Sequence, residues 1–138
     1  MTKEVSIIID GVQIGTEEEP IIMTASGTYH LQNDKHYIQY EEPTEDGQGT
    51  IKNRIKITPS QVEMTKKGAS DSQMNFDLNH STEIIYQTPY GNLFFEVKTN
   101  QLEVIETEKL IEVKLEYTLY SNGDLIAEHR TIIRINSL

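Results

Sequence analysis

The chain has 138 residues, no cysteine and a formal net charge of −10. This length is typical of one domain, so we expect a single domain over residues 1–138. The absence of cysteine excludes disulfides, thiolate zinc sites and cysteine nucleophiles. The negative charge argues against nucleic acid as a partner, because phosphate binding requires a basic surface.

The N-terminal segment is too polar to act as a leader or a membrane anchor. Its apolar run, Ile7 to Ile9, ends at Asp10. A signal peptide needs an apolar stretch of about 7–15 residues, and a membrane helix needs about 20. We therefore expect a cytoplasmic protein without a membrane partner.

Apolar and polar residues alternate along most of the chain, which is the period of a β-strand. The alternating segments are, in chain order, 21–31, 36–40, 51–57, 62–64, 74–78, 84–88, 93–97, 102–104, 111–119 and 125–135. The acidic segments Gly15–Pro20 and Pro43–Gly49 are expected to be loops. The best helix candidate, 101–113, breaks at Thr107 and fits two strands joined at Glu108–Lys109 better.

Short turns join nearly all of these segments. Asn122-Gly123 supplies two residues that tolerate positive φ, so 121–124 is predicted to be a type I′ hairpin turn, and Pro59-Ser60 marks another turn. Many short strands in sequence favour an all-β sandwich or barrel, and a meander hides its apolar face by closing on itself. The sequence therefore predicts an antiparallel up-and-down β-barrel of about 8–10 strands, with little or no helix and the apolar parity inside.

Four of the ten aromatic residues surround one Pro-Tyr-Gly turn at residues 89–91: Tyr86, Tyr90, Phe94 and Phe95. Proline fixes the first central residue of the turn and Gly91 can adopt the left-handed conformation, so Tyr90 is expected on a rigid loop at a barrel end. By parity Tyr86 and Phe95 point inward, whereas Phe94 points outward. The four aromatic side chains are therefore expected in three environments: the interior, the outer face and a loop at a barrel end.

The motif Tyr86-Gln-Thr-Pro-Tyr-Gly91, together with the following strand and the strand of Tyr117, resembles the YwiB-like family. Further matches extend over nearly the whole chain: Tyr29, Tyr40-Glu41-Glu42, Gly49-Thr50 and Gly68. Family members can carry arginine ahead of that glycine, where this chain has Lys66, which keeps the charge but loses a bidentate fork. The resemblance implies a bacterial β-barrel of the calycin (lipocalin-like) type, with unknown function. Lipid transport would follow from the fold by analogy alone.

Three of the four histidines, His36, His80 and His129, share the inward parity, whereas His30 does not. Three inward imidazoles are a possible zinc set. However, no two of them have His-x-His spacing, and His36 and His80 lie at strand ends. We interpret them as rim or hydrogen-bonded histidines and expect no metal.

The acidic runs and the rest of the chain contain no catalytic motif. Glu17, Glu18 and Glu19 fit a solvated loop, because no calcium-ligand spacing accompanies them. Glu41 and Glu42 are consecutive in a strand and point to opposite faces. Phosphate loops and nucleophile elbows are absent, so we expect no catalytic residue and no cofactor, and an enzyme ranks third among the hypotheses.

A polar fringe on the otherwise apolar interior supplies candidates for ligand binding. These candidates are Tyr86, Tyr90, Tyr117, Tyr40, Tyr29 and His129. A barrel of about eight strands is either filled by side chains or holds one small ligand, and tyrosine suits both cases. The leading hypothesis is a binding module that takes a small, partly apolar molecule at the barrel mouth.

The alternative hypothesis is a protein–protein interaction module or homodimer with a filled interior. Its contact surface would be formed by apolar residues on the outward parity: Ile85, Phe94, Ile105, Ile126 and Ile132. Convergence of these residues into one large patch would favour an interface. The chain is thus expected to be a monomer or a homodimer.

One basic stripe stands out in this acidic chain. Lys52, Arg54 and Lys56 are spaced by two along a predicted strand, opposite in parity to its isoleucines. The stripe is either a local anion-binding face or the solvated side of a sheet whose other side is apolar.

Overall fold

The computed structural model describes residues 2–44, 46–68, 71–88 and 90–138, with only the backbone described for Thr2 and for residues 86–88. The described residues contain no helix, and hence none that is long and apolar enough to cross a membrane. They form ten strands: β1 (Thr2–Gln13), β2 (Ile21–Gln32), β3 (Lys35–Pro43), β4 (Thr50–Ile57), β5 (Gln61–Lys67), β6 (Ser72–Asp77), β7 (Thr82–Thr88), β8 (Gly91–Glu106), β9 (Leu110–Ser121) and β10 (Asp124–Ser137).

All paired strands are antiparallel, in the order β6-β5-β4-β3-β2-β1-β10-β9-β8-β7. The first and last strands therefore lie together at the centre of the sheet, with Ile7 opposite Ile135. The edge strands β6 and β7 face each other, and the Thr82 hydroxyl donates to the Asn75 carbonyl between them. The predicted up-and-down barrel is confirmed; it is nearly closed, and its hydrogen-bond ladder is interrupted between β6 and β7.

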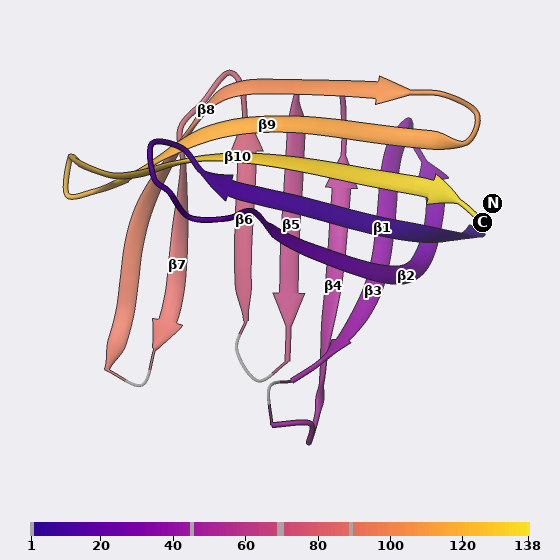
Figure 1. Cartoon of the computed structure of the whole chain (residues 1–138), viewed down its shortest axis with the longest axis horizontal. Helices are drawn as coiled ribbons and strands as arrows, with labels where there is room; N and C mark the ends of the chain where they lie inside the picture. Colours follow the sequence, from indigo (N-terminus) through magenta and orange to yellow (C-terminus); the bar gives the residue numbers. More distant parts are fainter. Residues whose placement is uncertain (1, 45, 69–70, 89) are drawn as a thin grey trace.

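The sheet folds back on itself as two layers. In Figure 1, β3 to β7 stand side by side, whereas β9, β10 and β1 run across them. The long strand β8 turns from one layer into the other, and its register with β9 shifts between Thr99 and Gln101. The extra residue, Asn100, is a β-bulge that bends the strand, and its amide donates to the Thr118 hydroxyl at 2.8 Å.

The second corner of the sheet lies in β2 at Gly27. This residue is paired with Val5 of β1 on one side and with Tyr40 of β3 on the other. A Cβ atom on Gly27 would lie only 2.2 Å from the carbonyl oxygen of Gln39. The close approach of the two backbones therefore requires glycine at this position.

The core lies between the two layers and contains the inward parity of the strands. Along β4, for example, Ile55 and Ile57 are buried whereas Lys52 and Arg54 are exposed. Each fully buried side chain of this size contributes about 1.5–3 kcal/mol of transfer free energy. The buried cluster is Val5, Ile7, Ile38, Tyr40, Ile55, Ile57, Val62, Phe76, Ile84, Val97, Leu102, Ile111, Val113, Leu115, Ile133 and Ile135.

Several local predictions were right and others were wrong. Asn122 and Gly123 have φ values of 52° and 83°, which confirms a turn with two left-handed residues. Segments 93–97 and 102–104, predicted to be separate strands, are both part of the continuous strand β8 because the chain bends at a bulge without leaving the sheet. The strand β1 was not predicted. Its run Ile7 to Ile9 does not alternate, because Ile8 on the outer face is itself half-buried.

We predict that Gly27→Ala lowers the free energy of unfolding by about 1–3 kcal/mol, the range typical of overpacking that shifts the backbone. Urea denaturation monitored by circular dichroism measures the change. Gly11→Ala is the matched control, because its Cβ would have only Thr131 Oγ1 nearby, at 3.8 Å. Equal stability of the two variants would show that β2 and β3 do not approach closely at Gly27.

Candidate functional site

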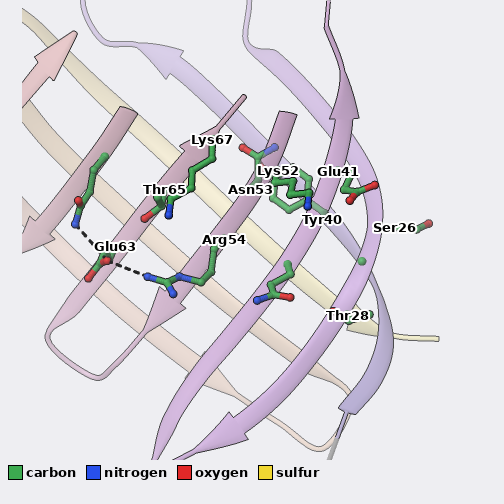
Figure 2. A pocket seen from close by; sticks show the side chains of 13 residues that line it. Ser26, Thr28, Tyr40, Glu41, Lys52, Asn53, Arg54, Glu63, Thr65 and Lys67 are labelled. Carbon is green, nitrogen blue, oxygen red and sulfur yellow. Dashed lines mark hydrogen bonds and ion pairs between the residues drawn. The ribbon is translucent and has the colours of Figure 1, made fainter. Parts of the chain in front are cut away.

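The largest hollow described in the molecule is a groove of about 700 Å³ on the outer face of β2 to β6, the face opposite to the core. Figure 2 shows its labelled side chains on these strands, with the layer that contains β10 behind them. The groove is lined by Ser26, Gly27, Thr28, Gln39, Tyr40, Glu41, Lys52, Asn53, Arg54, Glu63, Thr65, Lys67 and Gln73. Most of these residues are on the polar parity of their strands.

Strand register determines which polar groups meet in this groove. Thr28 lies opposite Gln39, and Gln39 lies opposite Arg54. On the other side of β4, Arg54 lies opposite Thr65 and Lys52 lies opposite Lys67. The groove therefore combines hydroxyl, amide, carboxylate and cationic groups contributed by neighbouring strands.

The cation at the middle of the groove is held by a carboxylate. Arg54 Nη2 lies 3.5 Å from Glu63 Oε1 (Figure 2), and the Gln73 amide donates to the same oxygen at 3.2 Å. In contrast, neither Lys52 nor Lys67 forms an ion pair with any residue that the structure describes. These two ammonium groups are available to a ligand.

A second hollow, of about 370 Å³, shares Thr65, Lys67 and Gln73 with the groove. It reaches Glu83 and Ile85 on β7. The polar surface thus continues from β2 across the sheet to the interruption between β6 and β7.

The predicted ligand-binding residues whose side chains the structure describes do not gather at one barrel mouth. Tyr40 borders the groove and is buried, and burial together with the Glu42 carboxylate raises its pKa to about 12. Tyr90 is fully exposed in the turn between β7 and β8. The Tyr86 side chain, like Pro89, lies outside the described part of the chain.

Tyr29 belongs to a separate cluster at one end of the barrel. Its hydroxyl is 2.8 Å from His36 Nδ1, and His36 Nε2 is 3.3 Å from Glu106 Oε2. An imidazole protonated at Nε2 satisfies both contacts, accepting from the tyrosine and donating to the carboxylate. Burial and the nearby Glu106 charge raise the pKa of Tyr29. His36 is thus a buried, hydrogen-bonded histidine, as the sequence predicted.

Tyr117 and His129 are the two predicted residues that the structure does bring together. Their rings stack with centroids 5.3 Å apart, and Phe76 lies 4.7 Å from Tyr117. Burial lowers the pKa of His129, and the Glu18 carboxylate opposes this effect. Tyr117 thus packs against both Phe76 and His129.

Two of the histidine predictions have different outcomes. His80, predicted to point inward, is exposed between β6 and β7, because the chain leaves the sheet before this residue. His30 lies on the outer face as predicted, where it stacks on Tyr37 with a centroid distance of 5.0 Å. No group of three or more histidine, aspartate or glutamate residues able to hold a metal ion occurs in the described ranges.

The outward apolar residues lie on β7, β8 and β10. Ile85 and Phe94 face each other across β7 and β8, and both are exposed. Ile105 lies opposite Glu112 on β9, and Ile132 lies opposite Lys114, so charged side chains separate them. Ile126 lies at the register shift near the start of β10. Ile105 and Ile132 are therefore separated from each other, whereas Ile85 and Phe94 form an exposed cross-strand pair.

Comparison with known proteins assigns the family. Residues 7–133 match the family described as "Domain of unknown function (DUF1934)", and the chain belongs to it. It is similar to the "Uncharacterized beta-barrel protein YwiB" of Bacillus subtilis (strain 168), with 23% identity over 103 residues that cover 75% of this chain and 71% of that protein. The crystal structure of the ywiB protein from Bacillus subtilis matches with a TM-score of 0.83 and 19% identity, covering 99% of this chain and 93% of that chain.

These findings confirm the family resemblance and the β-barrel fold. At this level of identity the structural match concerns the fold, and the descriptions of the relatives name no activity. Function must therefore be argued from the residues of this chain.

The groove was missed by sequence reasoning because its residues are spread over five strands. Ser26, Thr28 and Gln39 are unremarkable polar residues on an outward parity. The one available signal was the basic stripe, and two of its members, Lys52 and Arg54, line the groove whereas Lys56 does not. Lys67 became part of the same site only through its register with Lys52.

We predict that Tyr117→Ala lowers the free energy of unfolding by about 3 kcal/mol, because truncating a packed aromatic residue leaves a cavity. Chemical denaturation measures the change, with Phe94→Ala as the control on an exposed ring. An unchanged midpoint for Tyr117→Ala would mean that this ring borders open space.

We also predict a specific pH dependence for His129. Its folded-state pKa is below the ordinary value of 6.5, so as the pH falls the unfolded state takes up this proton first and stability is lost. Between about pH 7.5 and about pH 5.5, the free energy of unfolding should therefore fall less in His129→Gln than in the wild type. His80→Gln controls for loss of an imidazole. An identical pH dependence of His129→Gln and wild type would show that the folded state does not lower the pKa of His129.

Proposed function

We propose that the protein is a binding module that holds a small polar molecule in the groove on the outer face of β2 to β6. The observation that carries the proposal is the groove itself, with a volume of about 700 Å³ and a lining drawn from five strands. Ligand sites typically have volumes of about 300–1,000 Å³. This site differs from the expected barrel mouth, because the side chains of the buried cluster occupy the interior.

The lining favours a ligand with many hydrogen-bonding groups. Ser26, Thr28 and Gln39 supply donors and acceptors along one side, and Gln73 supplies an amide on the other. A partly apolar ligand, as expected from the inward tyrosines, would leave these groups without partners and incur their desolvation cost. We therefore favour a polar ligand, bound without covalent chemistry. As a separate part of the proposal, the protein acts in the cytoplasm.

The groove is formed by strands within one sheet, so its polar groups are held in place before a ligand arrives. The Arg54–Glu63 pair and the Gln73 contact to Glu63 bridge three strands across its centre. Such preorganisation reduces the entropy lost on binding. It supports a role in recognition that requires no large movement of the sheet.

A substitution that fills the groove tests the proposal. Thr28 is exposed and lines the groove, whereas Thr24 is exposed on the same face of the same strand outside it. After incubation with a small-molecule extract, we expect native mass spectrometry to show an adduct on the wild type and on Thr24→Trp but not on Thr28→Trp.

Retention of the adduct by Thr28→Trp would contradict the proposal. If Tyr117→Ala, shown by circular dichroism to be folded, lost the adduct while Thr28→Trp retained it, the ligand would instead lie near the stacked rings. Absence of any adduct on the wild type would also count against the proposal.

A further inference from the structure

Two lysines lie directly opposite each other in the groove. Lys52 of β4 and Lys67 of β5 are partners in the antiparallel register and are exposed on the outer face. Like charges in directly opposite positions destabilise a sheet. The protein thus has an unfavourable cross-strand pair among the residues that line the groove.

Two neighbouring cations are neutralised by carboxylates, whereas Lys56, further along β4, forms no ion pair with a described residue. What sets Lys52 and Lys67 apart is therefore that they lie directly opposite each other. Arg54 pairs with Glu63 at 3.5 Å, and Lys66 pairs with Glu42 at 3.2 Å on the inner side of the sheet. Lys52 and Lys67 are not ion-paired within the described ranges, although the whole chain has 22 acidic residues. Glu41 is opposite Lys52 on β3, yet no ion pair forms between them.

Resting on the proposed function, we infer that the ligand carries a phosphate group, which binds between Lys52 and Lys67. A dianion placed there converts a repulsion between two ammonium groups into two attractions. Lysine binds phosphate as a point charge, and two lysines match the two negative charges of a phosphate dianion. The one arginine of the groove is already engaged by Glu63.

The rest of the groove fits a hydroxyl-bearing body attached to that phosphate. Ser26, Thr28 and Gln39 lie on β2 and β3, to one side of the lysine pair. Their hydroxyl and amide groups can each donate and accept hydrogen bonds, which matches the hydroxyl groups of a sugar-like molecule. The inferred ligand class is therefore a small phosphorylated polyol.

Isothermal titration and amide chemical-shift mapping with glucose 6-phosphate test the inference, with glucose and inorganic phosphate as separate probes. We expect glucose 6-phosphate to shift the amides of the groove strands. Lys52→Gln and Lys67→Gln should each weaken its binding by roughly tenfold or more, the effect of losing one charge-assisted contact. Lys56→Gln is the matched control, because Lys56 has the same outward parity on β4 but lies outside the groove.

A second readout separates a binding role from a structural one. Lys67→Gln removes the like-charge pair, so without ligand its melting temperature should be higher than that of the wild type. Inorganic phosphate, compared with chloride at equal ionic strength, should raise the melting temperature of the wild type more than that of Lys67→Gln.

Two results would overturn the inference in different ways. Binding of glucose 6-phosphate in the groove that Lys52→Gln and Lys67→Gln leave unchanged would retain the proposed function and refute the phosphate site. Glucose 6-phosphate could instead bind the two groove variants and Lys56→Gln equally strongly and shift amides outside β2 to β6. This result would refute both the phosphate site and the proposed function.

Discussion

The structure depends on folding one apolar sheet face against itself. Each strand carries its apolar side chains on a single face, and the chain has no helix among its described residues that could cover them. The sheet therefore bends at Gly27 in β2 and at the Asn100 bulge in β8, so that two layers cross and bury Ile7, Ile38, Val113 and Ile133 between them. Both corners are local backbone features, but the whole core depends on them.

Because side chains pack the interior, we propose that binding occurs on the outer surface. Polar groups on the inward parity contact one another at the barrel ends. His36 contacts Tyr29 and Glu106, and Tyr117 stacks on His129. The side chains on the opposite parity of β2 to β6 do not pack the interior. Its side chains form a groove in which an unfavourable lysine pair persists in an acidic protein. Unfavourable interactions of this kind are typical of functional sites, where stability is lower than it could be.

Strand periodicity and turn chemistry predicted most of the fold, because both are properties of neighbouring residues. The alternation of 111–119 and 125–135 and the Asn122-Gly123 turn correspond to β9, β10 and their hairpin. The unbroken Ile7–Ile9 run concealed β1, and a bulge made one strand look like two. The turn at Asn33 and Asp34, with φ values of 53° and 63°, uses left-handed residues other than glycine. The groove was less predictable, since it depends on cross-strand register, which brings Lys67 to Lys52 and separates Tyr29 from Tyr117.

If side chains fill the space between the layers, so that binding occurs on the outer face, a crystal structure under xenon pressure should show it. Xenon enters empty apolar cavities and reveals them without disturbing the protein. We expect no xenon among Ile38, Ile55, Val113 and Ile133, which are at most 1% exposed. A well-occupied xenon atom at the centre of this cluster would contradict this expectation and would restore the barrel interior as the site of binding.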